Sequence, residues 1–235
     1  MTEDEQYYAA TRSNFLRSID AAGDVDDLAS EVGEIEVTSV LDVGCGIGQA
    51  LYPLAVAAGA SGVGIDVSED GLRIGREIYL ERFPDARISF LRSMAESLPF
   101  ENESFDVLNC GLALPYMDNA TAIAEMSRVM RPGGILLLKI HHPRFYLGEI
   151  VRGLKGAGLS PIIHGTRVIV AGTVYHIFGR QPRFKPLHES YQTEWMLRRE
   201  LPRHGLTIER PQKKTNPATP AFVIRKTRQT QTATR

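Results

Sequence analysis

A glycine-rich turn constrains this chain more than any other feature. Directly after an apolar run, glycine occupies every second position: Gly44, Gly46 and Gly48. The apolar run at 37–43 predicts a buried strand, and residues 48–60 predict a helix that Gly59 ends. Such a turn lets a ligand approach the backbone closely, because glycine carries no Cβ. In an open parallel sheet the turn lies at the carboxyl ends of the strands, where ligands bind. The sequence therefore predicts a nucleotide-like site here.

Strand and helix patterns alternate through the first 140 residues. Further strands are expected at 62–66, 87–91, 105–110 and 134–140. Helices are expected from the N-cap Ser68 to about Phe83 and over 119–130, and a turn is expected at 131–134. Strands that alternate with helices pair in parallel, with helices on both faces of the sheet. The fold class is therefore α/β.

The alternation breaks after residue 142. We expect a short helix at 145–158, a β-hairpin at 166–178 that turns near Gly172, a helix at 193–205 that Pro202 ends or kinks, and closing strands at 206–209 and 221–226. Residues 143–190 then form an insertion that would cover the site as a substrate lid. The free edge of the hairpin would offer a site for pairing into a homodimer.

The two ends of the chain have simpler patterns. A polar, helix-like segment at 4–28 makes residues 1–36 an N-terminal helical cap, and the polar tail at 227–235 is expected to be disordered. The acidic first residues lack the basic flank and apolar centre of a secretory signal. No segment approaches the roughly 20 apolar residues of a membrane span. The expectation is a cytoplasmic protein that does not act at a membrane.

The composition of the chain limits the kinds of molecule that it is expected to bind. With 43% apolar and 23% charged residues the chain has an ordinary globular composition. Its formal net charge of −1 gives no electrostatic attraction toward nucleic acid, whose binding proteins usually carry a basic face, and this argues against a nucleic-acid substrate. Cys45 and Cys110 lie inside apolar runs without a second ligand at metal spacing, so both are read as buried thiols and no metal is expected.

The spacing of the glycines excludes some classes of nucleotide-like ligand. A dinucleotide fingerprint would need a third glycine at position 49, which is Gln49, and no lysine followed by serine or threonine marks a phosphate-binding loop. A nicotinamide-dependent oxidoreductase is therefore disfavoured.

Four segments in order resemble the motifs of class I S-adenosylmethionine-dependent methyltransferases: VLDVGCGIGQ (40–49), GVGIDVSED (62–70), FDVLNCGLAL (105–114) and RVMRPGGILLL (128–138). The resemblance is to the broad branch that includes quinone-biosynthesis and small-molecule methyltransferases. It implies a single domain over 1–235 and a Rossmann-like, seven-stranded, mostly parallel sheet whose last strand is antiparallel.

The resemblance also implies how S-adenosylmethionine is held. It assigns Asp42 to the methionine end and Asp66 to the two ribose hydroxyls, as charge-assisted hydrogen bonds. The alternative for both aspartates is that they cap turns or helices. Members of the branch usually carry an acidic residue near the adenine where this chain has Met94, which could pack on the ring while the Ala95 N–H donates to it. The full set expected to bind the cofactor is Asp42, Gly44, Cys45, Gly46, Gly48, Asp66, Val67, Met94, Ala95 and Gly111.

Catalytic candidates come from position alone. Tyr116 follows the fourth strand, where relatives often carry histidine, and His141 and His142 end the fifth. Adjacent strand residues point to opposite faces, so at most one histidine should face the cleft, and His142 is preferred because it lies further toward the carboxyl end. A histidine pKa near 6.5 suits a general base. The alternative is that both histidines are polar residues at a strand end.

Other aromatic and basic residues could complete the site. Tyr7, Tyr8 and Arg12 could lie over the cofactor or instead pack on the sheet edge. Candidates for substrate contacts lie in or just after the lid: Tyr175, His176, His188, Tyr191 and Trp195.

The expected activity is methyl transfer from S-adenosylmethionine to an oxygen or nitrogen of a small-molecule acceptor. Two alternatives stay open. One is methylation of a ring carbon, as in quinone pathways, and the other is a cofactor-binding partner subunit without transferase activity.

Overall fold

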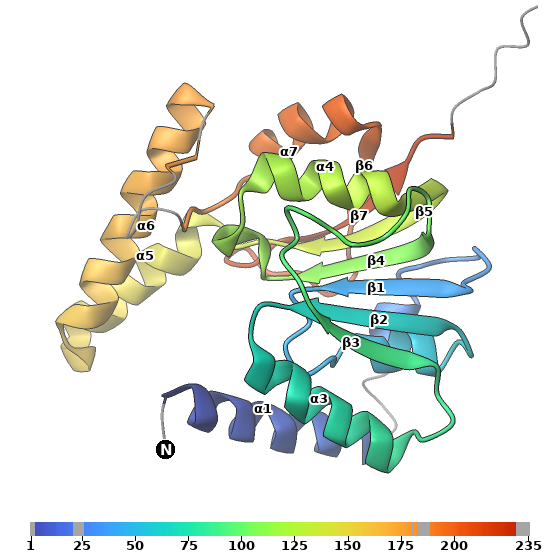
Figure 1. Ribbon diagram of the computed structural model, residues 1–235. Coiled ribbons are helices and arrows are strands. Elements are labelled where there is room, and N and C mark those ends of the chain that lie inside the picture. Colours follow the sequence, from blue (N-terminus) through green and yellow to red (C-terminus); the bar gives the residue numbers. More distant parts are fainter. Residues whose placement is uncertain (1–2, 21–25, 180, 183–188, 229–235) are drawn as a thin grey trace, which may run out of the picture.

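The computed structural model describes residues 3–20, 26–179, 181–182 and 189–228. One seven-stranded sheet runs through the molecule in the order β3-β2-β1-β4-β5-β7-β6 (Figure 1). The strands are β1 Ser39–Val43, β2 Ser61–Asp66, β3 Ile88–Arg92, β4 Phe105–Gly111, β5 Met130–Lys139, β6 Leu206–Pro211 and β7 Ala221–Lys226. Strands β1 to β5 pair in parallel, and β7 is antiparallel to β5 and β6. The predicted fold class is confirmed.

Alternate residues of the central strands pack into two separate cores, as a pleated sheet requires. Leu41 and Leu108 join one core with the helices α4 (Asn119–Val129) and α7 (Glu194–Glu200). Val40 and Val107 join the other with α1 (Glu3–Asp20) and α3 (Glu69–Arg82). Both faces of the sheet are therefore covered, and only the strand ends remain for ligands.

Several sequence signals end the elements as expected. Ser68 caps α3, with its hydroxyl accepting from the Gly71 N–H, and Phe83 closes that helix. Gly59 adopts a φ of 66° at the end of the segment that follows the glycine-rich turn. Helix α7 ends at Glu200, and Pro202 lies in the 3-10 turn η4 (Leu201–His204).

The predicted hairpin at 166–178 is wrong. These residues belong to α6 (Leu159–Phe178), which packs against α5 (Pro143–Arg152) after the π-helical turn η3 (Gly153–Ala157). Tertiary packing overrides the β-branched content. Gly165 and Gly172 lie seven residues apart on one helical face, where an added Cβ would lie 2.7 Å from the Tyr146 carbonyl oxygen and 2.3 Å from the Tyr191 ring. Without the hairpin, the sheet-edge argument for a homodimer loses its basis.

Smaller differences between the expected and the observed elements occur where the backbone is irregular. The expected helix at 48–60 is instead a series of turns around one π-helical turn, η1 (Tyr52–Val56). The expected turn at 131–134 is part of β5, where the pairing with β4 shifts register and Gly133 has a φ of 82°. Helix α1 ends at Asp20, before the predicted boundary, and α2 covers Asp26–Ala29. Residues 229–235 of the predicted tail lie outside the described residues.

The helices α5 and α6 leave the carboxyl end of β5 as a pair and lie beyond the sheet (Figure 1). The predicted lid insertion thus corresponds to a helical pair rather than to a helix and a hairpin. Among the described residues, no helix is long and apolar enough to cross a membrane.

Candidate functional site

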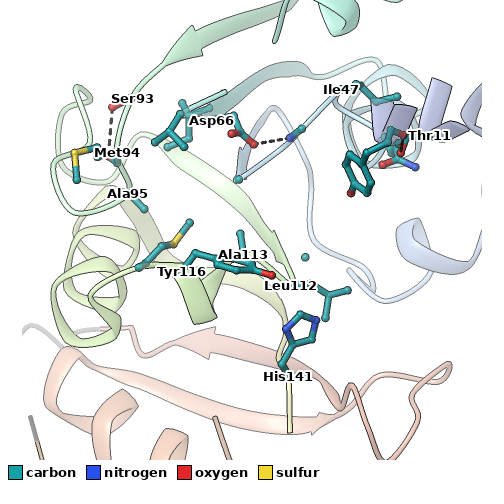
Figure 2. A pocket seen from close by; sticks show the side chains of 18 of the residues that line it. Thr11, Ile47, Asp66, Ser93, Met94, Ala95, Leu112, Ala113, Tyr116 and His141 are labelled. Atoms are coloured by element: carbon teal, nitrogen blue, oxygen red, sulfur yellow. Dashed lines mark hydrogen bonds between the residues drawn. The ribbon is translucent and has the colours of Figure 1, made fainter. Parts of the chain in front are cut away.

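A cavity of about 700 Å³ opens at the carboxyl ends of β1, β2 and β4. A neighbouring hollow of about 570 Å³ shares Gly44, Gly46, Gly111 and Leu112 with it, so the two adjoin at the glycine-rich turn. A volume of this size is typical of small-molecule and cofactor pockets. Figure 2 shows Asp66 on one side of the cavity and Tyr116 with His141 on another.

Backbone hydrogen bonds hold the glycine-rich turn against the end of β2. The N–H groups of Gly44 and Cys45 both donate to the Ile65 carbonyl, at 2.8 and 2.9 Å. Gly46 has a φ of 54°, and a Cβ there would meet no protein atom within 4 Å. Since Gly46 lines both hollows, the space that its side chain would enter is available to a ligand. Gly48 has a different role, because its missing Cβ leaves room for the Phe90 ring.

Asp66 joins this turn to helix α3. Its Oδ2 accepts from the Gly46 N–H at 2.8 Å and its Oδ1 from the Ser68 N–H at 2.9 Å. Two backbone donors therefore fix the plane of the carboxylate at the cavity wall, and each oxygen retains a lone pair. A pair of fixed acceptor oxygens suits a vicinal diol, as the resemblance implied for Asp66.

Asp42 is buried and lies on the neighbouring hollow with Cys45. The Asn109 amide donates to its Oδ1 at 2.7 Å. Burial raises the pKa of Asp42 to about 7; the Asn109 hydrogen bond acts in the opposite direction and the Asp66 charge adds to the rise. With this pKa the carboxyl is only partly ionised near neutral pH, and a cation bound beside it favours the charged form. The donor set thus suits a ligand with a positive charge at one end and a diol in the middle, which is the chemistry of S-adenosylmethionine.

The turn after β3 supplies the far wall of the cavity. Met94 and Ala95 of this turn line the cavity, with Met94 58% exposed and Ala95 buried, and Val67 lines it from the end of β2. Glu96 also lines the cavity, and its carboxylate accepts from the Asp118 N–H at 2.8 Å. An exposed methionine beside a fixed backbone offers a flexible apolar surface for an aromatic ring.

Helix α1 forms one side of the cavity. Tyr7, Tyr8 and Thr11 of α1 line the cavity, while Arg12 pairs with Glu81 of α3 at 3.8 Å. A Cβ on Gly71 of α3 would lie 2.9 Å from the Tyr8 hydroxyl, so the two helices are in close contact. The structure therefore brings the two tyrosines, and not the arginine, to the site.

The two histidines lie just beyond β5 and point to different places, but in the opposite sense to the preference for His142. His141 is buried and lines the cavity. His142 instead caps α5, with its Nδ1 accepting from the Arg144 N–H at 3.3 Å. Chain direction alone could not reveal this, because β5 already ends at Lys139 and α5 takes His142 as its cap.

The remaining catalytic candidate is Tyr116, which lines the cavity and is 56% exposed. Partial burial, together with the charges of Glu189 and Glu149 and a contribution from Tyr7, raises the pKa of Tyr116 to about 12. Its phenol is therefore protonated near neutral pH and can donate a hydrogen bond to a ligand.

Most lid candidates lie away from the cavity. Tyr175, His176 and Trp195 line a separate, smaller hollow, and Tyr191 packs under α6 at Gly172. His188 lies outside the described residues. Of the described part of 143–190, Phe145 alone lines the cavity. Sequence reasoning did not single out Phe145, although its position directly after the fifth strand was a usable signal. The other lining residues that it missed are Thr11, Ile47, Gln49, Ile65, Ser93, Glu96, Leu112, Ala113 and Met117.

Comparison with known proteins agrees with this geometry. Residues 41–138 match a family model described as a methyltransferase domain. The chain is 36% identical over 116 residues to a demethylmenaquinone methyltransferase of Lactococcus lactis, a match that covers 48% of this chain and 46% of that protein. It is 34% identical over 118 residues to O-methyltransferase cnsE of Penicillium expansum, covering 48% and 43%. The chain thus matches about half the length of these curated relatives.

A solved structure resembles almost the whole chain. The magnesium protoporphyrin IX methyltransferase of Synechocystis PCC 6803, determined with bound SAH, superposes with a TM-score of 0.61, covering 86% of this chain and 82% of that one. The sequence identity is 17%, so this likeness concerns the fold.

Proposed function

We propose that the protein transfers a methyl group from S-adenosylmethionine to an oxygen or nitrogen of a small molecule, because residues 41–138 match a methyltransferase domain and the sheet has the seven-stranded order that the resemblance implied. The observation that carries the proposal is the pair of adjoining hollows at the strand ends. They bring a buried carboxyl, a fixed carboxylate and a glycine-rich turn next to a region lined by Tyr116 and His141.

The residues divide into two groups by what they would bind. Asp42 would face the positively charged methionine end, and Asp66 would accept from the ribose hydroxyls. Met94 and the Ala95 N–H would face the adenine. When bound, the cofactor supplies an activated methyl group. The protein orients the acceptor and excludes water, and such positioning can contribute on the order of 7 to 11 kcal/mol to lowering the barrier.

The acceptor region favours a compact, partly aromatic molecule. Tyr7, Tyr8, Tyr116, Met117 and Phe145 bring aromatic and apolar surface to the cavity. Aromatic faces also stabilise a nearby cation, by roughly 0.5 to 2 kcal/mol. The net charge of −1 supports a small acceptor rather than nucleic acid.

A second candidate is methylation of a ring carbon. The name of the Lactococcus relative, a demethylmenaquinone methyltransferase, supports it, whereas the Penicillium relative is named an O-methyltransferase. The alternative of a non-catalytic, cofactor-binding subunit is distinguished from both by turnover.

The test is formation of S-adenosylhomocysteine from S-adenosylmethionine with matched panels of phenols, aliphatic alcohols, amines and hydroquinones. Mass spectrometry of the product identifies the methylated atom. Turnover with a hydroxyl or amine acceptor supports the proposal, and turnover with the hydroquinone at carbon supports the second candidate. Tight binding of S-adenosylmethionine without turnover on any panel would favour the non-catalytic subunit.

A further inference from the structure

A continuous chain of hydrogen bonds leads from the cavity wall into the α5–α6 pair. His141 Nδ1 lies 3.2 Å from the Tyr146 hydroxyl, which donates to Glu189 Oε1 at 3.0 Å. The other oxygen of Glu189 lies 2.9 Å from His164 Nε2, and His164 Nδ1 lies 2.7 Å from Glu149 Oε2. Five ionisable or hydroxyl side chains from three segments of the chain are thus linked in one line.

The three residues nearest the cavity are more deeply buried than the two that follow them. Tyr146 is completely buried, His141 is 6% exposed and Glu189 is 5% exposed. The side chains of His164 and Glu149 are 32% and 16% exposed. Buried polar groups are retained only when they are hydrogen-bonded, so the inner three residues depend on one another.

The pattern of donors and acceptors assigns the position of each proton in this network. The Tyr146 hydroxyl has one proton and gives it to Glu189. Its oxygen must therefore accept from His141, which requires the Nδ1–H tautomer. His141 Nε2 then keeps a free lone pair.

His164 completes the charge pattern. It faces a carboxylate at each ring nitrogen and can donate to both only as an imidazolium. Burial opposes its charge, but the hydrogen bonds and charges of Glu189 and Glu149 raise the pKa of His164 above its ordinary value. The network thus places a cation between two carboxylates behind His141.

The ring of His141 is also fixed in its plane. It stacks on Phe145 with centroids 4.2 Å apart and planes 4° from parallel. Both rings line the cavity (Figure 2 labels His141). Burial lowers the pKa of His141, so the ring is neutral near neutral pH. A neutral, oriented imidazole with one free nitrogen has the properties of a general base.

We propose that His141 is the general base for a hydroxyl acceptor, and that Tyr146 and Glu189, with His164 behind them, are positioning residues that hold it in the Nδ1–H tautomer. The proposal rests on the proposed function and specifies its substrate class. The acceptor oxygen bonds to the methyl carbon as the carbon–sulfur bond breaks with its electron pair remaining on sulfur. The hydroxyl proton passes to His141 Nε2 and returns to solvent after the product leaves.

The charged groups that face His141 set its response to pH. Glu189 and Glu149 raise its pKa, while Lys139 and His164 lower it, and Tyr146 touches it directly. The rate with a hydroxyl acceptor should therefore rise with pH as His141 loses its proton, and level off at or below neutrality.

The decisive experiment compares Tyr146→Phe and His141→Gln with the wild type. The matched control is Tyr191→Phe, which removes a hydroxyl that lies just after the lid, contacts Thr173 Oγ1 at 3.2 Å and is outside the network. Nitrogen-15 NMR of histidine-labelled protein, recorded without cofactor, reads the tautomer. We expect an Nδ1–H signal for His141 in the wild type and in Tyr191→Phe, and its replacement by the Nε2–H form in Tyr146→Phe.

Kinetics with phenol and matched amine panels give the second measurement. His141→Gln should lower kcat with hydroxyl acceptors by about 100- to 10,000-fold. Tyr146→Phe should lower it by roughly 10- to 100-fold, by analogy with the hydrogen-bond partners that orient metal-binding histidines. Binding of S-adenosylmethionine, measured by calorimetry, should change little in either variant.

The outcomes separate this inference from the proposed function. An Nε2–H tautomer in the wild type, or full activity of His141→Gln on a phenol, would overturn the inference and leave the methyltransferase proposal standing. Absence of cofactor binding in the wild type would contradict the proposed function, while the NMR result would still decide the tautomer.

Discussion

The backbone N–H of Gly46 donates to Asp66 Oδ2 at 2.8 Å, across 20 residues of sequence. This bond ties the glycine-rich turn after β1 to the end of β2. The turn thereby orients the carboxylate expected to hold the ribose, before any ligand binds. Cofactor binding then costs little reorganisation at this point.

The first prediction concerns Gly46→Ala. Both Gly46 and Gly59 have a positive φ, and at both positions a Cβ would meet no protein atom within 4 Å. Each alanine variant should lose about 1 to 2 kcal/mol of unfolding free energy, because the left-handed conformation disfavours a Cβ. Only Gly46→Ala should also weaken S-adenosylmethionine binding, by about tenfold or more, or ~1.4 kcal/mol. Calorimetric titration of the matched pair checks this, and equal affinities for the two variants would contradict the account.

The second prediction uses the raised pKa of Asp42, about 7. A bound cation favours the ionised carboxylate, so below pH 7 binding must release a proton. Affinity for S-adenosylmethionine should rise with pH toward about tenfold per pH unit below that pKa, and level off above it. Asp42→Asn should bind weakly and show a flat profile between pH 5.5 and 8. Titrations at pH 6 in two buffers of different ionisation enthalpy measure the released proton. A wild-type profile as flat as that of the variant would refute the assignment.

The same shift predicts a stability effect of defined sign. A carboxyl whose folded-state pKa lies above its ordinary value of 3.8 binds more protons in the folded state between pH 4 and 7. Its contribution to unfolding free energy therefore falls as pH rises through that window. Without cofactor, Asp42→Asn should gain stability relative to the wild type between pH 5 and 8, as measured by urea unfolding. A constant difference across this range would contradict the burial argument.

The third prediction tests the packing of α6. An alanine at Gly172 would place its Cβ 2.3 Å from the Tyr191 ring, whereas Gly148 on α5 has no neighbour within 4 Å of that point. Gly172→Ala should lose about 1 to 3 kcal/mol through overpacking. Gly148→Ala should be neutral or gain up to about 1 kcal/mol through helix propensity. Thermal unfolding compares them, and a hairpin at 166–178 in place of the helix would remove the contrast.

The fourth prediction concerns His164. Its pKa is raised by Glu189 and Glu149, so its stabilising effect is complete below its ordinary pKa of 6.5 and is lost as pH rises through the folded-state value. The difference in melting temperature between the wild type and His164→Gln should be largest below pH 6.5 and shrink above it. A difference that grows with pH would show that His164 is not charged between the two carboxylates.

The sheet was predictable because its signals are local. Buried apolar runs, the N-cap Ser68 and the terminating Gly59 each act over a few residues, and the four motifs then fix strand order by resemblance. The closing strands β6 and β7 followed from the same patterns.

The structure of the lid was less predictable because it depends on contacts between segments that are far apart in the sequence. The β-branched run at 166–178 favours a strand locally. The glycines at 165 and 172 are needed because a side chain there would clash with α5 or with Tyr191, and these contacts exist only in the folded chain. His142 is similar, since its capping role depends on where α5 begins. The hydrogen-bond network of His141, Tyr146, Glu189 and His164 links residues up to 48 positions apart in sequence. No spacing pattern in the sequence predicts it.

The central claim is that the turn at Gly44–Gly48 and Asp66 hold S-adenosylmethionine. The measurement that tests it most directly is calorimetric titration of S-adenosylmethionine, S-adenosylhomocysteine and NAD into the wild type, Asp66→Ala and the surface control Asp70→Ala. The account predicts binding of both sulfur nucleosides to the wild type and to Asp70→Ala, its loss in Asp66→Ala, and no binding of NAD. Binding of NAD, or undiminished binding of S-adenosylmethionine to Asp66→Ala, would contradict it.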